Sequence, residues 1–81
     1  MRVEIRLPQW GMGMTEGLIA EWLKQVGDHV NEGEPLARVE TAKVETELES
    51  PETGVIVEIM VPAGTTVEIY TPLAAIETAG R

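Results

Sequence analysis

Residues 17–43 read GLIAEWLKQVGDHVNEGEPLARVETAK, and the chain contains this pattern twice. Residues 54–80 read GVIVEIMVPAGTTVEIYTPLAAIETAG and align with it without a gap, at a shift of 37 positions. Eleven of the 27 aligned pairs are identical, where chance would give about one or two. The identical pairs are mostly turn formers and apolar residues: Gly17/Gly54, Ile19/Ile56, Glu21/Glu58, Gly27/Gly64, Val30/Val67, Pro35/Pro72, Leu36/Leu73, Ala37/Ala74, Glu40/Glu77, Thr41/Thr78 and Ala42/Ala79. We therefore predict two equal halves related by a quasi-two-fold axis.

Each half has the residue pattern of short β-strands. We expect strands at residues 2–7, 18–23, 36–41, 55–61 and 73–78, and very short strands at Val30 and Val67. The runs 18–23 and 55–61 are rich in branched and aromatic residues, which predicts strands with much of both faces buried. Turns are expected at residues 27–28, 33–35, 64–65 and 70–72, and a helix over 15–26 is disfavoured by its branched residues and by Pro62 in the second copy. Seven or eight short strands in two matching halves predict an all-β fold, a small sandwich or flattened barrel.

Length and composition restrict the classes of function. With 81 residues the chain is at most one small domain, 1–81. Its formal charge of −8, from 14 acidic and 6 basic residues, argues against nucleic-acid binding and suits a monomer. The chain has no cysteine, so it offers no thiolate metal site and no thiol nucleophile, and no apolar run suits a signal peptide or a membrane span. This composition fits a cytoplasm-like compartment.

The segment VETAKVET, residues 39–46, predicts a β-hairpin with Ala42 and Lys43 at the centre of its turn. The opposed pairs would be Thr41/Val44, Glu40/Glu45, Val39/Thr46, Arg38/Glu47 and Ala37/Leu48. One face, with Thr41, Val44, Val39, Thr46, Ala37 and Leu48, could then pack inward, while the charged residues face outward. The turn lacks the Asn-Gly or Asp-Gly of a tight hairpin, and the Glu40/Glu45 pair would cost about 0.2–1 kcal/mol, which an Arg38/Glu47 pair could partly offset. Such misfits tend to collect at functional places, although a solvated pair near a tip also costs little.

Lys43, one of only two lysines, breaks the internal repeat because it aligns with Gly80. The scaffold therefore does not require a lysine at this position. One interpretation is an ordinary solvated lysine. The other is a modification site, because a hairpin tip keeps the amine accessible to an enzyme and too hydrated to act as a catalytic base.

The whole chain resembles the lipoyl domains of 2-oxo acid dehydrogenase complexes, within the biotinyl/lipoyl-attachment family. The resemblance rests on LPQWGMGMTEGLIAEW, VGDHV and VETAKVET in their order and spacing. It implies two four-stranded antiparallel sheets in quasi-two-fold symmetry and lipoic acid joined by an amide to Lys43. It also implies that Glu40, Gly27 and Gly54 help a lipoate-attaching enzyme to recognise the hairpin.

The same resemblance implies a non-catalytic swinging-arm carrier, part of a dihydrolipoamide acyltransferase, in the bacterial cytoplasm or the mitochondrial matrix. Its partners would be a thiamine-diphosphate dehydrogenase, the acyltransferase catalytic domain and a flavin-containing dihydrolipoyl dehydrogenase. Two residues depart from the family pattern, Ala42 where aspartate is usual and Val44 where alanine is common. These positions are linked to partner recognition, and the departures favour an acetoin-type or branched-substrate complex without naming the oxo acid. The loop 8–16, PQWGMGMTE, would also contribute to recognition through Trp10, Met12 and Met14.

Several alternatives remain open from the sequence. A biotinyl carrier domain shares this fold, but it usually places methionine on both sides of the lysine. An unmodified interaction module is the third reading, and an enzyme is disfavoured because the only histidine, His29, is expected at the surface without a catalytic or metal role. Trp10 could pack under its loop instead of meeting a partner, whereas Trp22 is expected in the core. The ending ETAGR favours a domain cut from a longer chain over a free protein.

Overall fold

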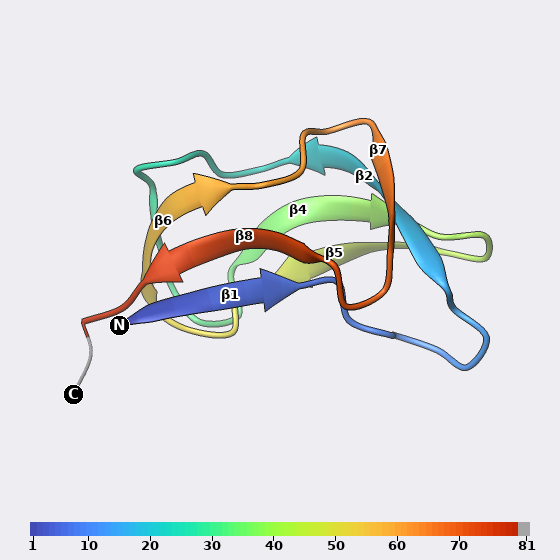
Figure 1. Cartoon of the computed structure of the whole chain (residues 1–81), viewed down its shortest axis with the longest axis horizontal. Helices are drawn as coiled ribbons and strands as arrows, with labels where there is room; N and C mark the ends of the chain where they lie inside the picture. The colour runs from blue at the N-terminus through green and yellow to red at the C-terminus, as the bar shows by residue number, and fades with distance from the viewer. Residues whose placement is uncertain (80–81) are drawn as a thin grey trace.

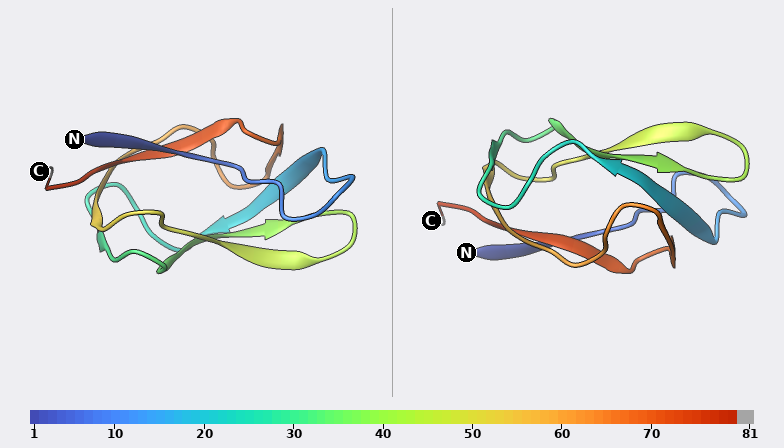
Figure 2. Two further views of the ribbon diagram at one scale, coloured as in Figure 1. Left: turned by 90° about the horizontal axis from the view of Figure 1, so that it is seen from below. Right: turned by 90° about the horizontal axis from the view of Figure 1, so that it is seen from above.

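Eight short strands form the regular structure of residues 1–79, the part of the chain that the computed structural model describes. They are β1 (Arg2–Arg6), β2 (Glu16–Trp22), β3 (His29–Val30), β4 (Pro35–Glu40), β5 (Glu45–Glu49), β6 (Gly54–Ile59), β7 (Thr65–Glu68) and β8 (Pro72–Glu77). The strands form two four-stranded antiparallel sheets, in the orders β1-β8-β6-β3 and β5-β4-β2-β7 (Figure 1). Figure 2 shows the sheets edge-on as two facing layers. The predicted all-β flattened sandwich is confirmed.

The predicted quasi-two-fold relation is present in both topology and hydrogen bonding. A shift of 37 residues carries β2, β3 and β4 onto β6, β7 and β8, and the outer strands β5 and β1 complete the match. Backbone bonds repeat with it: the amides of Leu23 and Met60 donate to Leu36 and Leu73, each at 2.8 Å. Both β2 and β6 also carry a register shift at the same place, between Ile19 and Glu21 and between Ile56 and Glu58. The two halves are therefore one local structure made twice, with Lys43's aligned partner Gly80 outside the described residues.

The core lies between the two sheets and is built from the inward face of each strand. Its members are apolar, and most of them repeat between the halves: Ile5, Leu7, Ile19, Val30, Leu36, Ala37, Val39, Leu48, Ile56, Val61, Leu73, Ala74 and Ile76. The prediction that much of both faces is buried is wrong for residues 55–61, since Val55 and Val57 of β6 are exposed at their outer side, whereas Leu18, Ala20 and Trp22 of β2 are half-buried. A two-layer sandwich covers only the inner face of each antiparallel sheet, so the outer face meets water.

The predicted burial of Trp22 is wrong, whereas the predicted exposure of His29 is confirmed. Trp22 is half-buried at the edge of the core rather than inside it, because its Nε1 donates to the carbonyl of Val61 at 2.8 Å and needs that partner. His29 is exposed, as predicted. Within residues 1–79, no helix is long and apolar enough to cross a membrane, and no group of three or more His, Asp and Glu side chains could hold a metal ion.

The two ends of the molecule differ although the two halves match. Eight residues lie between Leu7 and Glu16. In the other half, Ser50 takes the place of Leu7 in the backbone hydrogen bonds and Thr53 aligns with Glu16, and only two residues lie between them. The six extra residues lengthen this connection into the long loop (residues 8–15), which lies at the same end as the turn that contains Lys43 (Figure 1). The chain termini occupy the opposite end, where Met1 takes the place of Val44: its carbonyl accepts from the Thr78 amide at 2.8 Å. Within residues 1–79, the long loop and the closed turn, which the other end of the molecule lacks, therefore lie together beside Lys43.

Candidate functional site

Lys43 lies at the tip of the β4–β5 hairpin, in a turn we call the lysine turn (residues 41–44). The hairpin has the predicted register, with Glu40 opposite Glu45, Val39 opposite Thr46, Arg38 opposite Glu47 and Ala37 opposite Leu48. The Thr41 amide donates to the Val44 carbonyl at 2.8 Å and closes the turn, with Ala42 and Lys43 exposed at its centre. The predicted position of Lys43 at a hairpin tip is confirmed.

The Thr41 side chain explains how this turn forms without Asn-Gly. Its Oγ1 accepts from the amides of Val44 and Lys43, at 3.2 and 3.4 Å, and donates to the Val44 carbonyl at 3.0 Å. Neither Ala42 nor Lys43 has a positive φ, so the turn does not require the glycine that a type I′ hairpin demands. A threonine hydroxyl that bonds to the local backbone stabilises a turn in its own right. The threonine two residues before the lysine was the sequence signal for this, and the turn prediction did not use it.

The side chains of the hairpin lie as predicted, except for the burial of Val44 and the ion-pair partner of Arg38. Ala37, Val39 and Leu48 are buried, but Val44 is 58% exposed and does not pack inward, because the lysine turn extends beyond the opposite sheet (Figure 1). Arg38 does not form an ion pair with Glu47; its Nη1 lies 2.9 Å from Oε1 of Glu21 on β2. Since β4 lies between β5 and β2, Arg38 has a carboxylate on either side and takes the one on β2.

The two lysines of the chain have different surroundings. Lys24 Nζ lies 2.7 Å from Oε2 of Glu34, and each side chain is 29% exposed. The hydrogen bond to Glu34, together with its negative charge, raises the pKa of Lys24 above its usual value, while the hydrogen bond from Lys24 lowers the pKa of Glu34. Lys43 forms no ion pair with any residue in 1–79, although Glu40 and Glu45 flank its turn. Lys43 is thus the lysine whose amine is free to react.

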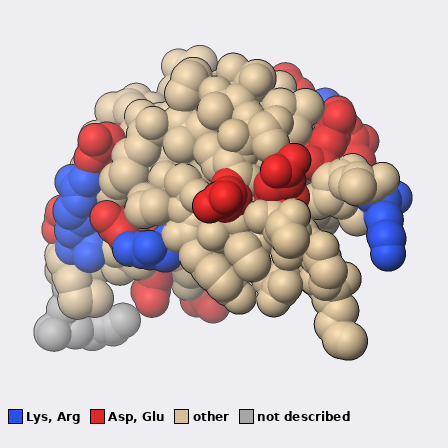
Figure 3. Space-filling view, turned by 45° about the vertical axis from the view of Figure 1, so that its right-hand side comes forward, with Lys and Arg blue, Asp and Glu red and all other residues tan. Residues whose placement is uncertain are grey.

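A groove of about 820 Å³ separates the lysine turn from the long loop. Residues 10–18 form one wall, residues 40–44 form the other, and Thr66 completes the lining. Figure 3 brings this end of the molecule forward and shows acidic side chains across it, with Lys and Arg sparse. The structure therefore brings Trp10, Met12 and Met14 beside Ala42, Lys43 and Val44, as the predicted recognition surface requires.

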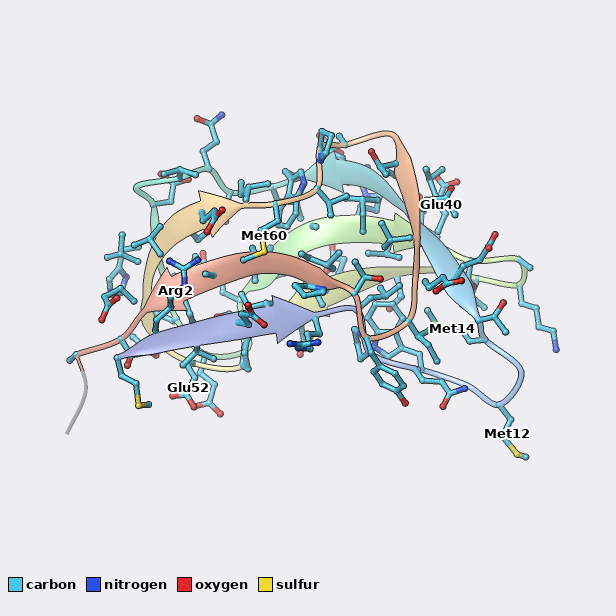
Figure 4. All side chains as sticks on the ribbon, viewed as in Figure 1. Arg2, Met12, Met14, Glu40, Glu52 and Met60 are labelled. Carbon is cyan, nitrogen blue, oxygen red and sulfur yellow. The ribbon has the colours of Figure 1, made fainter. Side chains whose placement is uncertain are left out.

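The three apolar side chains of the long loop are placed differently. Met12 is 93% exposed and points outward at the loop tip, whereas Met14 points back towards the body of the domain (Figure 4) and packs against the core. Trp10 is 40% exposed, and its amide donates to Sδ of Met14 at 3.4 Å. The loop closes on itself through a bond from the Met14 amide to the Gly11 carbonyl at 3.1 Å. Met12 and Trp10 therefore offer apolar surface, and Met14 anchors the loop.

The three residues predicted to guide the attaching enzyme are not brought together. Glu40 ends β4 directly beside the lysine turn and is exposed. Gly27, in the β2–β3 connection, and Gly54, the first residue of β6, belong to the opposite end of the molecule (Figure 1). Each glycine has a local structural cause: Gly27 has a φ of +98°, and a Cβ on Gly54 would overlap the carbonyl oxygen of Glu77.

Comparison with known proteins places this arrangement in a family. A family model for biotin- and lipoyl-carrying domains, described as "Biotin-requiring enzyme", matches residues 3–76. The chain belongs to the biotinyl/lipoyl-attachment family.

Within that family the relatives are lipoyl-carrying acyltransferases. The chain is 45% identical over 73 residues to the dihydrolipoyllysine-residue succinyltransferase component of the 2-oxoglutarate dehydrogenase complex of Staphylococcus saprophyticus, covering 90% of this chain and 17% of that protein. It is 41% identical over 64 residues to the acetyltransferase component of the acetoin cleaving system of Bacillus subtilis, covering 79% of this chain and 16% of that protein. The chain thus spans less than a fifth of the length of these relatives.

A solved structure agrees with the sequence relatives. The lipoyl domain of the 2-oxoglutarate dehydrogenase complex from Azotobacter vinelandii superposes with a TM-score of 0.72 at 29% identity, covering 94% of this chain and 99% of that one. The chain is therefore a lipoyl domain in fold and in sequence, with the carrier role of such domains.

Proposed function

We propose that this lipoyl domain carries lipoic acid in amide linkage to Nζ of Lys43, as part of a dihydrolipoamide acyltransferase in a 2-oxo acid or acetoin dehydrogenase complex. One observation supports this above the others: Lys43 is exposed at the tip of a turn and has no ion-pair partner in residues 1–79, whereas Lys24 is held by Glu34. The proposal places the domain in the bacterial cytoplasm or the mitochondrial matrix.

The residues around Lys43 fit such a group. An amide needs an accessible, nucleophilic amine, and the lysine turn presents one without competing salt bridges. Thr41 fixes the backbone on both sides of Lys43, and the two sheets form a rigid base, so the attached arm would move while its root stays in place. When bound, the lipoyl group supplies a disulfide for acyl transfer and redox chemistry, which this cysteine-free chain does not contain. Amide formation removes one positive charge and takes the formal charge from −8 to −9.

The partner classes follow from that role. They are a lipoate-attaching enzyme, a thiamine-diphosphate dehydrogenase, the acyltransferase catalytic domain and a dihydrolipoyl dehydrogenase. Tethering of the arm raises its effective concentration at each active site, which favours transfer between them. Relatives from succinyl-, acetyl- and acetoin-type systems lie between 40% and 46% identity, so the substrate is left to experiment.

Intact mass spectrometry tests the attachment site. The domain is co-expressed with a lipoate-attaching enzyme in medium that contains lipoate, and we expect the mass gain of a single lipoyl amide. The Lys43→Arg variant should gain nothing, and the matched Lys24→Arg variant should be modified like the unaltered domain. Modification of the Lys43→Arg variant would contradict the proposal. A biotinyl mass gain would support the biotin alternative, and no gain with active attaching enzyme would support an unmodified interaction module.

A second assay addresses the substrate. The lipoylated domain is offered to purified pyruvate, 2-oxoglutarate, branched-chain and acetoin dehydrogenases, each with its substrate, and reductive acylation is followed by mass. We expect one of them to acylate the domain with a kcat/KM well above the others. Failure of all four on fully lipoylated domain would exclude a partner among these classes.

A further inference from the structure

Tyr70 is the one residue other than glycine with a positive φ in residues 1–79, at 68°. Residues with a side chain rarely adopt this region, because Cβ crowds the backbone there. The internal repeat supplies the comparison, since the equivalent residue is Gly33, with a φ of 87°. One half of the molecule thus uses glycine at this turn, while the other half places a tyrosine in the same strained conformation.

The backbone task of Tyr70 does not require its side chain. In the first half, the Gly33 amide donates to the Ser50 carbonyl at 2.8 Å, and the Ser50 amide donates to the Glu34 carbonyl at 2.9 Å. In the second half, the Tyr70 amide donates to the Leu7 carbonyl at 2.7 Å, and the Leu7 amide donates to the Thr71 carbonyl at 3.1 Å. We call each of these pairs of backbone hydrogen bonds a clamp. The two clamps have the same pattern, and glycine forms the first one without strain.

The two clamps hold loops of different length. The turn that contains Gly33 holds the short connection to β6. The turn that contains Tyr70 holds the long loop at both of its stems, because the adjacent Ile69 amide donates to the Thr15 carbonyl at 3.1 Å. Tyr70 therefore lies where the six extra residues of this half begin and end.

The Tyr70 side chain continues from this clamp into the loop. Its hydroxyl lies 3.5 Å from Oε1 of Gln9, and Nε2 of Gln9 donates to the Met14 carbonyl at 3.2 Å. Met14 is the residue whose amide closes the loop on Gly11 and whose sulfur accepts from Trp10. A path of contacts thus runs from the tyrosine through Gln9 to the anchor of the long loop.

We propose that Tyr70 is a positioning residue for the long loop: its side chain, kept in a left-handed conformation where glycine would suffice for the fold, fixes the loop that forms one wall of the groove beside Lys43. The consequence for dehydrogenase recognition rests on the proposed function. The loop-fixing role itself does not, since it concerns only contacts within this chain.

Hydrogen exchange on the unmodified domain tests the loop-fixing role. Tyr70→Gly and Tyr70→Asn both suit a positive φ but lack the phenol whose hydroxyl contacts Gln9, so the fold should persist while the loop loosens. We expect exchange of the Met14 amide to accelerate by about tenfold in both variants, with exchange of the Thr41 amide in the lysine turn unchanged. The Tyr70→Phe variant loses only the hydroxyl contact with Gln9, on which the path to Met14 depends, so its Met14 exchange should also accelerate, by about threefold or more. Unchanged Met14 exchange in a folded Tyr70→Gly domain would overturn the inference.

Acylation kinetics then test the functional consequence. On lipoylated domain, the Tyr70→Gly variant should lose kcat/KM for reductive acylation by about tenfold, mainly through KM, while lipoylation by the attaching enzyme proceeds at the unaltered rate. A loosened loop with unaltered acylation would refute the recognition role of Tyr70 and leave Lys43 as the carrier site. If neither the unaltered domain nor any variant accepts lipoate, the proposed function is wrong. The hydrogen-exchange measurement still tests the loop-fixing role, because it uses the unmodified domain.

Discussion

Gly54 shows how packing alone can require a particular residue. A Cβ at this position would overlap the Glu77 carbonyl oxygen and lie 3.0 Å from the carbonyl carbon, both in backbone that cannot swing aside. The resemblance to lipoyl domains assigns Gly54 to recognition by the attaching enzyme, yet it lies at the end opposite Lys43. Its influence on attachment would therefore act through the fold.

We expect Gly54→Ala to lower the free energy of unfolding by about 1–3 kcal/mol, because β6 and β8 must separate to admit the methyl group. Urea denaturation measures this. Gly11→Ala is the matched control, since nothing lies within 4 Å of its Cβ and its change should stay within about 0.5 kcal/mol. A Gly54→Ala domain of normal stability that is lipoylated slowly would instead show that the glycine is read directly by the enzyme.

Single residues were predictable where a repeat or an alternation fixed them. Lys43 was identified because it differs from its aligned residue in the internal repeat. The burial of Val39 and Leu48 was predicted from the alternation of side chains along a strand. The exposure of Val44 and the partner of Arg38 depend on what lies across the sandwich and on the neighbouring strand. Neither feature can be predicted from the residues of the hairpin alone.

At the scale of elements, the lysine turn has its own stabilising contact. The Thr41 hydroxyl makes three backbone contacts across the turn, whereas within residues 1–79 the hydroxyl of its equivalent, Thr78, makes one, to the Met1 carbonyl at 3.2 Å. The equivalent strand ends at β8 and β1 meet without a closed turn. The difference offers an internal control for what the threonine does to the hairpin.

We expect Thr41→Val to lower the free energy of unfolding by about 1 kcal/mol and to slow lipoylation of Lys43, because the turn loses its side-chain acceptor. Thr41→Ser should restore both, since serine keeps the hydroxyl. Thr78→Val loses one contact at the far end, so it should cost less stability and leave the lipoylation rate unaltered. Denaturation and an attachment assay measure the two effects. Equal lipoylation of the Thr41→Val and unaltered domains would mean that the turn needs no bracing to be recognised.

The register of β4 and β5 could be predicted because a slip of one residue would expose Val39 and bury Glu40. The kind of turn could not, because the missing glycine pointed to misfit while the compensating hydroxyl depends on a rotamer of Thr41. The strands β2 and β6 were placed correctly in sequence, but the burial of β6 was overestimated. An apolar run alone does not reveal whether a second layer covers its outer face.

At the scale of the whole molecule, the repeat predicted the symmetry but not the strand order. Two copies of a three-strand pattern are compatible with several sheets, and the pairings of β1 with β8 and of β2 with β7 come from long-range packing. The same symmetry explains the placement of the site. Since the two-fold operation exchanges the ends of the sandwich, one end can hold the termini while the other holds both the long loop and the lysine turn (Figure 2).

Quasi-two-fold symmetry also makes an energetic prediction. Leu36 on β4 and Leu73 on β8 are equivalent, both are fully buried, and each accepts the equivalent backbone bond at its carbonyl, from Leu23 and Met60. Truncation to alanine removes buried apolar surface and leaves a cavity, so each of Leu36→Ala and Leu73→Ala should cost about 2–5 kcal/mol, a large share of the stability of a domain this small. We expect the two values from urea denaturation to agree within about 1 kcal/mol. Val57→Ala, at a position 39% exposed, is the control and should cost about 0.5 kcal/mol or less. Strongly unequal losses for Leu36→Ala and Leu73→Ala would contradict this prediction. They would show that the two halves have the same backbone structure but contribute differently to the free energy of unfolding.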